Sequence, residues 1–71
     1  VGGTFPVVLN VANDEVVAAF LNNYIQFSDI PPLIEDALNK HEFINSPDLK
    51  IISEISQWTL NYIHKEISAI A

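Results

Sequence analysis

Histidines and carboxylates are the side chains of this chain that could carry out chemistry, because none of its 71 residues is Cys. His41 and His64 lie far apart in the sequence, and neither has the neighbouring ligands of a usual zinc-site spacing. Asp14 and Glu15 could form a general acid–base pair, but adjacent residues of a helix diverge by about 100° and cannot converge on one reacting atom. No Ser lies in a nucleophile elbow, and Gly2-Gly3 lacks the spacing of a phosphate-binding loop. We therefore predict no catalytic, cofactor-binding or metal-binding residue in this chain.

Asn10 and Asn13 are polar side chains within the most apolar stretch of the chain, residues 9–21. Three residues apart on a helix, they project to the same flank. Their amides either contact a neighbouring domain and help to shape its site, or satisfy backbone groups within this domain. The sequence leaves both interpretations open.

The stretch around these asparagines predicts a first and central helix over residues 6–22. Pro6 suits its first turn, and Asn22-Asn23 suits its end because Asn tolerates the left-handed conformation. A helix that is apolar on more than one side is central or meets a partner on its back. The core face is expected to consist of Val8, Leu9, Ala12, Val16, Ala19 and Phe20. The opposite apolar residues, which we call the back face and expect to be exposed in the isolated chain, are Val7, Val11, Val17 and Leu21.

A short connection leads to the second helix. Residues 24–27 are too few to build a sheet alone, so we expect an extended connector with Ile25 and Phe27 packed inward. Ser28 is a candidate N-cap, and Pro31-Pro32 belongs in a first turn because neither residue donates a backbone hydrogen bond.

The second helix is predicted over residues 29–40, and its dipole favours His41 at the carboxyl end. Ser46-Pro47-Asp48 then supplies an N-cap, a first-turn proline and a first-turn acid, which start a third helix over residues 47–69. The apolar phase runs through Ser56 and favours one continuous helix, although a break there would give a fourth. The apolar side of this helix consists of Ile51, Ile52, Ile55, Trp58, Tyr62, Ile63, Ile67 and Ile70.

These elements predict an all-α fold, a small three- or four-helix bundle, in a single domain of residues 1–71. Residues 1–5 form a linker or the end of an upstream helix, for which Gly2-Gly3 would be the C-cap. The chain has no Met, so we expect a fragment or processed piece of a longer protein. No apolar run approaches the ~20 residues that span a membrane. Nine acidic residues against three lysines disfavour nucleic acid and anionic membranes as partners.

Two stretches resemble a known family in order and spacing. Leu-Asn-x-Ala-Asn-acid at residues 9–14, with Val-x-Ala-Phe-Leu at residues 17–21, is similar to the start of the C-terminal helical domain of 1-deoxy-D-xylulose 5-phosphate reductoisomerases. Residues 25–35 resemble the following element. The family usually has Ala in place of Val11 and Glu in place of Asp14. The matching residues are Leu9, Asn10, Ala12, Asn13, Asp14, Ala19, Phe20, Leu21, Ile25, Phe27, Asp29 and Ile30.

The resemblance implies an oxidoreductase of the non-mevalonate route to isoprenoid precursors. Such an enzyme rearranges 1-deoxy-D-xylulose 5-phosphate and reduces the product with NADPH, using Mg²⁺ or Mn²⁺. In the family, an N-terminal domain binds NADPH, and a central domain supplies the metal ligands, the phosphate site and the dimer contact. The chain would be the helical domain packed against both, in a homodimeric parent enzyme of the bacterial cytoplasm or of a plastid-type organelle.

We expect a structural domain that braces the catalytic domain and is inactive when isolated. Trp58 is expected in the core or between domains. The alternative is an acidic helical carrier or protein-interaction module, in which a serine would hold a phosphopantetheine arm. Ser28 precedes its Asp and Ser46 is followed by Pro, so neither has the Asp-Ser-hydrophobic order of a carrier. The possible interdomain contacts are Asn10, Asn13, Val11, Val17 and Leu21.

Overall fold

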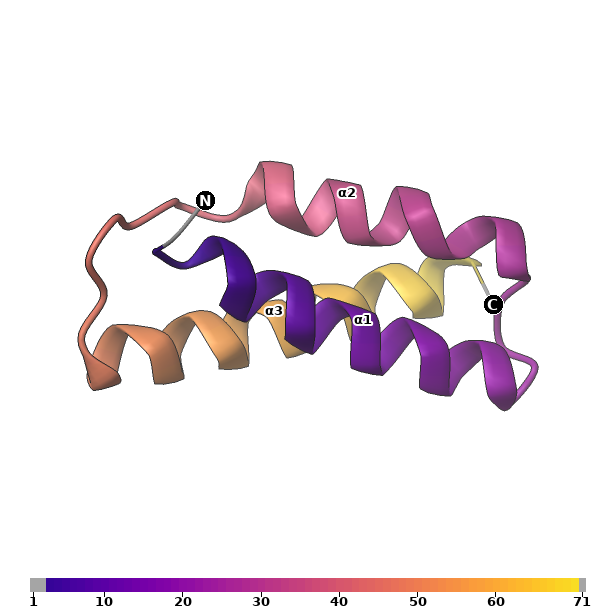
Figure 1. The fold of residues 1–71 in the computed structure, drawn as a ribbon. Helices are drawn as coiled ribbons and strands as arrows, with labels where there is room; N and C mark the ends of the chain where they lie inside the picture. Colours follow the sequence, from indigo (N-terminus) through magenta and orange to yellow (C-terminus); the bar gives the residue numbers. More distant parts are fainter. Residues whose placement is uncertain (1–2, 71) are drawn as a thin grey trace.

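Three α-helices and one 3₁₀ turn form the fold in the computed structural model, which describes residues 3–70 (Figure 1). Helix α1 spans Phe5–Leu21, α2 spans Ile30–Lys40 and α3 spans Leu49–Ile70, and the 3₁₀ turn η1 spans Phe27–Asp29. The helices run along the length of a molecule that measures 36 × 19 × 17 Å. Residues 3–70 contain no strand, which confirms the predicted all-α class.

The observed helix boundaries lie within two residues of the predicted ranges, and α2 ends at residue 40 as predicted. α3 continues through Ser56, so the described part of the chain forms three α-helices rather than four. Asn23 has a φ of 65° directly after α1, as expected from the tolerance of Asn for the left-handed conformation. Val1 and Gly2 lie outside the described residues. The suggested C-cap of an upstream helix at Gly2-Gly3 therefore stays a prediction.

Gly3 lies directly against the connector between α2 and α3. Its φ is 65°, a conformation that residues with a Cβ atom rarely adopt. A Cβ atom here would lie 2.3 Å from the Ile44 backbone oxygen, which already accepts the Thr4 N–H at 3.0 Å. Glycine at this position therefore permits a backbone contact that any larger residue would displace.

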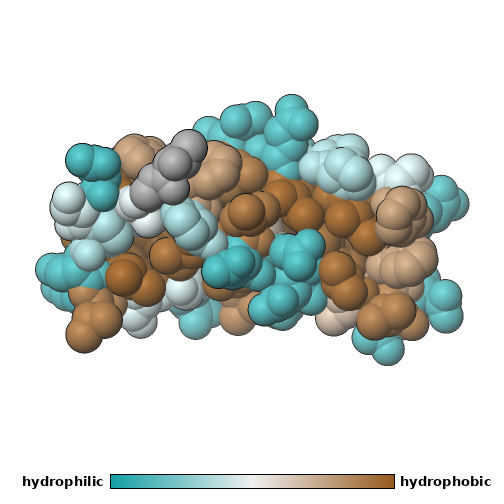
Figure 2. All heavy atoms as spheres, in the orientation of Figure 1, coloured by the Kyte–Doolittle hydropathy of each residue, from teal (hydrophilic) through white to brown (hydrophobic). Residues whose placement is uncertain are grey.

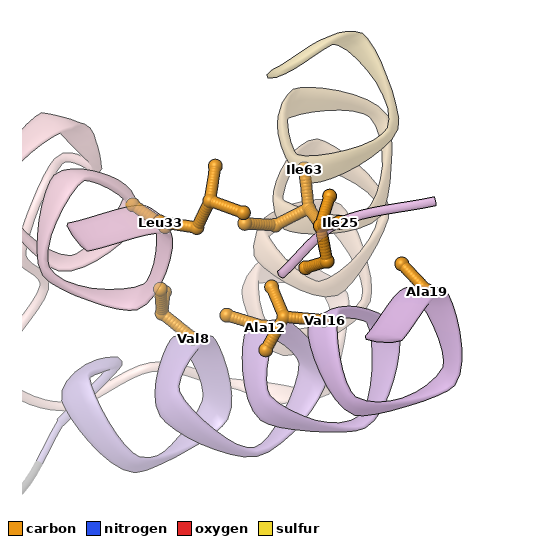
Figure 3. Packing of buried hydrophobic residues seen from close by; sticks show 8 residues of the cluster. Val8, Ala12, Val16, Ala19, Ile25, Leu33 and Ile63 are labelled. Atoms are coloured by element: carbon orange, nitrogen blue, oxygen red, sulfur yellow. The ribbon is translucent and has the colours of Figure 1, made fainter. Parts of the chain in front are cut away.

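The core lies between the three helices, and α1 supplies half of its buried apolar residues. Figure 3 shows Leu33 of α2 and Ile63 of α3 pointing toward Val8 and Val16 of α1. α1 packs extensively against both other helices, which contact each other much less. α1 is therefore the central helix, as its apolar pattern predicted. The buried apolar residues are Val8, Ala12, Val16, Ala19, Ile25, Leu33, Ala37 and Ile63.

Two apolar residues predicted to be inside are on the surface. Leu9 is 39% exposed because it lies at the edge of the core face, about 100° around the helix from Val8. Ile25 is buried as predicted, whereas Phe27 is 71% exposed. Phe27 already belongs to η1, so the alternation of the connector ends before it. Its ring packs edge-on against Phe20, with the ring centroids 5.6 Å apart.

Asp29 caps η1, which leads into α2, and Asp48 caps α3, so the predicted caps Ser28 and Ser46 are wrong. Asp29 Oδ2 accepts a backbone N–H from three residues earlier at 2.8 Å. Asp48 Oδ1 accepts the Ile51 N–H at 2.9 Å, one turn into α3. An ionised carboxylate makes a charge-assisted hydrogen bond and also interacts favourably with the positive end of the helix dipole.

Replacing Asp48 by Ala should destabilise the start of α3. The Ile51 N–H would lose its acceptor, and a lost N-cap costs about 1 kcal/mol. The measurement is the free energy of unfolding in urea, followed by helical circular dichroism. Asp48→Asn keeps a capping oxygen and should lose much less. Equal losses for the two variants would contradict the capping role.

Candidate functional site

The side chains considered above for chemistry do not converge on one site. Asp14 is exposed on α1, and His41 is buried after the end of α2. Glu15 and His64 are in contact with each other. Among residues 3–70, no group of three His, Cys, Asp or Glu side chains could hold a metal ion.

His41 belongs to a buried hydrogen-bond network, which we call the Thr4 cluster and which consists of Thr4, Leu38, His41 and Ile44. His41 Nδ1 lies 2.6 Å from the Leu38 carbonyl oxygen, which can only accept, so Nδ1 carries the proton in the neutral ring. Nε2 then accepts from the Thr4 hydroxyl at 3.1 Å. The Thr4 oxygen in turn accepts the Ile44 N–H at 3.0 Å. His41 lies at the end of α2 as predicted, but its ring ties that end to the start of α1.

Asn10 and Asn13 both lie on the exposed flank of α1. Within residues 3–70, no hydrogen bond joins either side chain to another residue. The interpretation in which they satisfy backbone groups of this domain therefore has no support in the structure. Their role in contacts between domains stays a prediction.

The back face of α1 changes its exposure along the helix. Val7 and Val11, in the first half, are half-buried. Val17 and Leu21, in the second half, are exposed, Leu21 by 72%. The predicted exposure of all four residues therefore holds only for the second half of the helix.

Exposed aromatic residues extend this surface into the connection between α1 and α2. Tyr24 is 61% exposed, and Phe27 is exposed as described above. We call Val17, Leu21, Tyr24 and Phe27 the apolar end of the domain. Figure 2 shows hydrophobic side chains on the visible face, including the right-hand end, where α1 runs into this connection. A gathering of exposed apolar residues at one end of a domain is typical of a surface that contacts another molecule or domain.

Trp58 stacks on Tyr62 along α3, with ring centroids 5.1 Å apart and ring planes inclined by 12°. Both residues are half-buried, so Trp58 packs within the domain and keeps part of its ring accessible. Burial raises the pKa of the Tyr62 phenol above its ordinary value, and the negative charges of Glu66 and Asp36 raise it further.

Tyr62 should therefore ionise at higher pH in the folded chain than in urea. Because the fold favours the neutral phenol, this stabilisation is fully present below the unfolded pKa of about 10 and is lost as pH rises through the folded-state pKa. The measurement is a spectrophotometric titration of the Tyr24→Phe variant, which retains Tyr62 as its one tyrosine. Adding Glu66→Gln should move the midpoint back toward the ordinary value. Identical midpoints in buffer and in urea would contradict the effect of the fold.

A groove of about 400 Å³ opens between the carboxyl-terminal halves of α1 and α3. Glu15 Oε1 and His64 Nε2 form a hydrogen bond across it. The two side chains were considered separately from the sequence and were not paired. No local pattern signals this pair, because 49 residues separate its members and only the packing of α3 on α1 brings them together. The groove is lined by Glu15, Ala18, Ala19, Asn22, Tyr24, His64, Ile67 and Ser68.

The fold and these surfaces define a small all-α domain that exposes an apolar end and a groove. The family model of the DXP reductoisomerase C-terminal domain matches residues 1–62, and the chain belongs to this family. The match confirms the resemblance carried by residues 9–35. The carrier interpretation has no support among these findings. The groove residues of α3, His64, Ile67 and Ser68, lie beyond the matched range.

Curated bacterial relatives agree with this assignment. The 1-deoxy-D-xylulose 5-phosphate reductoisomerase of Listeria welshimeri is 48% identical over 63 residues, which cover 89% of this chain and 17% of the relative. The enzyme of Halalkalibacterium halodurans is 48% identical over 66 residues, which cover 93% of this chain and 17% of the relative. The chain thus spans about one sixth of the length of these relatives. No solved structure matches the chain. Each helix within residues 3–70 is too short or too polar to cross a membrane.

Proposed function

We propose that the chain is a non-catalytic structural domain of an NADPH-dependent 1-deoxy-D-xylulose 5-phosphate reductoisomerase and that it braces the catalytic domain. The observation that carries the proposal is the family match over residues 1–62, in relatives of which this chain forms 17%. The intact protein would be a homodimeric oxidoreductase of isoprenoid precursor synthesis. It would act in the bacterial cytoplasm or in a plastid-type organelle.

The two cofactors of the proposed enzyme, NADPH and Mg²⁺ or Mn²⁺, would be bound by other parts of the intact protein. Residues 3–70 provide no cluster of metal ligands, and the sequence has no dinucleotide-binding fingerprint. We therefore assign no chemical step to this chain. Its contribution would be positional, since a domain packed against a catalytic site limits loop motion and water access there.

The apolar end is the surface that best suits such packing. Burying apolar area contributes about 25 cal/mol per Å², so large exposed side chains such as Leu21 and Phe27 gain most from being covered. Asn10, Asn13 and Val11 would extend the contact along α1, where amide groups can bond to polar groups of the neighbouring domain.

The decisive experiment is NADPH consumption by the intact protein, supplied with 1-deoxy-D-xylulose 5-phosphate and Mg²⁺ or Mn²⁺. The 71-residue chain is assayed in parallel. We expect turnover by the intact protein and none by the chain. A well-folded intact protein without turnover would refute the proposed parent activity, and turnover by the isolated chain would refute the structural role.

The apolar end is tested by Leu21→Gln in the intact protein. Placing an uncharged polar group in a covered apolar contact should lower the melting temperature and reduce kcat, because the contact between the domains would weaken. The matched control is Leu49→Gln, since Leu49 is 85% exposed at the start of α3, at the other end of the molecule (Figure 1). Equal effects of the two substitutions would show that the apolar end is not the contact surface.

A further inference from the structure

We infer that the groove between α1 and α3 receives an arginine side chain from a part of the intact protein outside residues 1–71. The inference rests on the proposed function in one respect, because it treats the chain as a domain of a longer protein. It adds the chemical identity of the group that docks here.

The groove presents hydrogen-bond acceptors that the domain itself leaves unused. Glu15 bonds to His64 through Oε1, which leaves Oε2 as an acceptor. Because His64 Nε2 donates in this bond, Nδ1 of the neutral ring is also an acceptor. The Asn22 amide nitrogen donates to the Ala18 carbonyl at 2.9 Å, so its Oδ1 is a third acceptor. The side chains of His64 and Glu15 are 57% and 30% exposed, so an incoming group can reach both.

A guanidinium group complements this set better than other side chains. It carries five N–H donors in a planar fork and no acceptor, and it pairs with a carboxylate through two parallel hydrogen bonds. Between the polar groups, the groove is lined by Ala18, Ala19 and Ile67, which can pack against the methylene groups of an arginine. A lysine would bring its donors on a single nitrogen and reach fewer of the separated acceptors.

The charge balance of the chain indicates that this group comes from elsewhere. The sequence has nine acidic residues, three lysines and no arginine. Lys40, Lys50 and Lys65 are exposed, and none lines the groove. A second copy of residues 1–71 therefore cannot supply an arginine, whereas the rest of a protein of which this chain is about one sixth can.

Thiol labelling in the intact protein tests whether the groove is covered. Because residues 1–71 contain no Cys, Ala18→Cys places a single thiol of this domain in the groove, and Ser53→Cys places one on the exposed side of α3. We expect alkylation at position 18 to be at least about tenfold slower than at position 53 in native protein, and the two rates to agree in urea. Equal native rates would overturn the inference.

The role of the carboxylate is tested in the Ala18→Cys background. Glu15→Gln removes the charge that holds the guanidinium and should raise the alkylation rate about tenfold, as expected for the loss of a charge-assisted hydrogen bond. Asp14→Asn changes the neighbouring, exposed carboxylate by the same chemistry and should leave the rate unchanged. The same rate in both variants would show that Glu15 does not hold the occupant.

Photocrosslinking identifies the occupant. A p-benzoyl-phenylalanine replaces Tyr24, which lines the groove, and in a control it replaces Phe43, which lies near the start of α1 and outside the groove. We expect position 24, and not position 43, to join an arginine-containing peptide of the same protein from outside residues 1–71. A peptide without arginine, a peptide of another protein, or no crosslink at position 24 would overturn the inference. The NADPH assay is independent of these readouts, so an inactive parent with a covered groove would refute the proposed enzyme and not the docking.

Discussion

Ile63→Ala should unfold much of the domain. Ile63 is the largest fully buried side chain, and it packs α3 into the core shared with α1 and α2 (Figure 3). Truncating a buried isoleucine to alanine costs about 2–5 kcal/mol, from the lost apolar burial and from the cavity left behind. A domain of this size has a total stability of only about 3–5 kcal/mol. Urea unfolding of the chain should therefore show a midpoint near zero denaturant for the variant.

Ile70→Ala provides the matched control for this substitution. It makes the same chemical change in the same helix, but Ile70 is 47% exposed. We expect a loss below about 1 kcal/mol, since little apolar area returns to water and no cavity forms. If the two variants lost equal stability, the packing of α3 through Ile63 would be wrong.

Thr4→Val should cause the second-largest loss of stability, although valine has nearly the same shape as threonine. The Thr4 hydroxyl accepts from Ile44 N–H and donates to His41 Nε2, and both Thr4 and the His41 ring are buried. Valine would leave both groups without a partner, and an unsatisfied buried polar group costs about 1–3 kcal/mol. We expect a loss of about 2 kcal/mol or more in the free energy of unfolding.

Thr59→Val is the control for Thr4→Val. It tests whether the loss of stability comes from the hydrogen bonds of Thr4 or from the removal of any buried hydroxyl. Thr59 is also fully buried, but its hydroxyl donates only to the Ile55 carbonyl one turn earlier in α3. That carbonyl keeps its helix hydrogen bond in the variant, so no buried group loses its last partner. We expect the free energy of unfolding to change by less than about 1 kcal/mol, because removing this hydrogen bond leaves no buried polar group without a partner.

The tautomer of His41 gives a second test of the Thr4 cluster. Nitrogen chemical shifts of the unsubstituted chain should show the Nδ1–H form of His41, and the opposite tautomer would contradict the cluster.

The helices could be predicted because their signals are local. Apolar residues at helical spacing, prolines in first turns and asparagines at the end of α1 act within a few residues of one another. The continuity of α3 through Ser56 followed from the same phase. The caps were harder, because a Ser and an Asp lay close together at each start and the sequence alone did not decide which side chain would reach the backbone.

The pairings between helices could not be predicted, since they depend on the rotation of each helix against its neighbour. Thr59 was not assigned to the apolar side of α3 from the sequence, but it lies one turn from both Ile55 and Ile63 and is fully buried. Leu9 belonged to the predicted core face and is 39% exposed, because it lies at the edge of that face. The Glu15–His64 pair and the contacts of Thr4 with His41 and Ile44 join residues 37 to 49 positions apart. The periodicity of apolar residues along one helix cannot predict contacts at such separations.

The central position of α1 has a consequence for the order of events during synthesis. α1 and α2 leave the ribosome first, yet the core residue that α3 contributes, Ile63, comes near the end of the described chain. Until then, one side of α1 has no helix to cover it. Helix pairs form in microseconds, whereas residues are added at about 5–20 per second. The 23 residues from His41 through Ile63, which follow the end of α2, therefore take on the order of a few seconds to synthesise, and this side stays uncovered for that time. During that interval the side of α1 that faces α3 would be accessible to a chaperone at the ribosomal exit, and the bundle would close only when almost the whole domain has emerged.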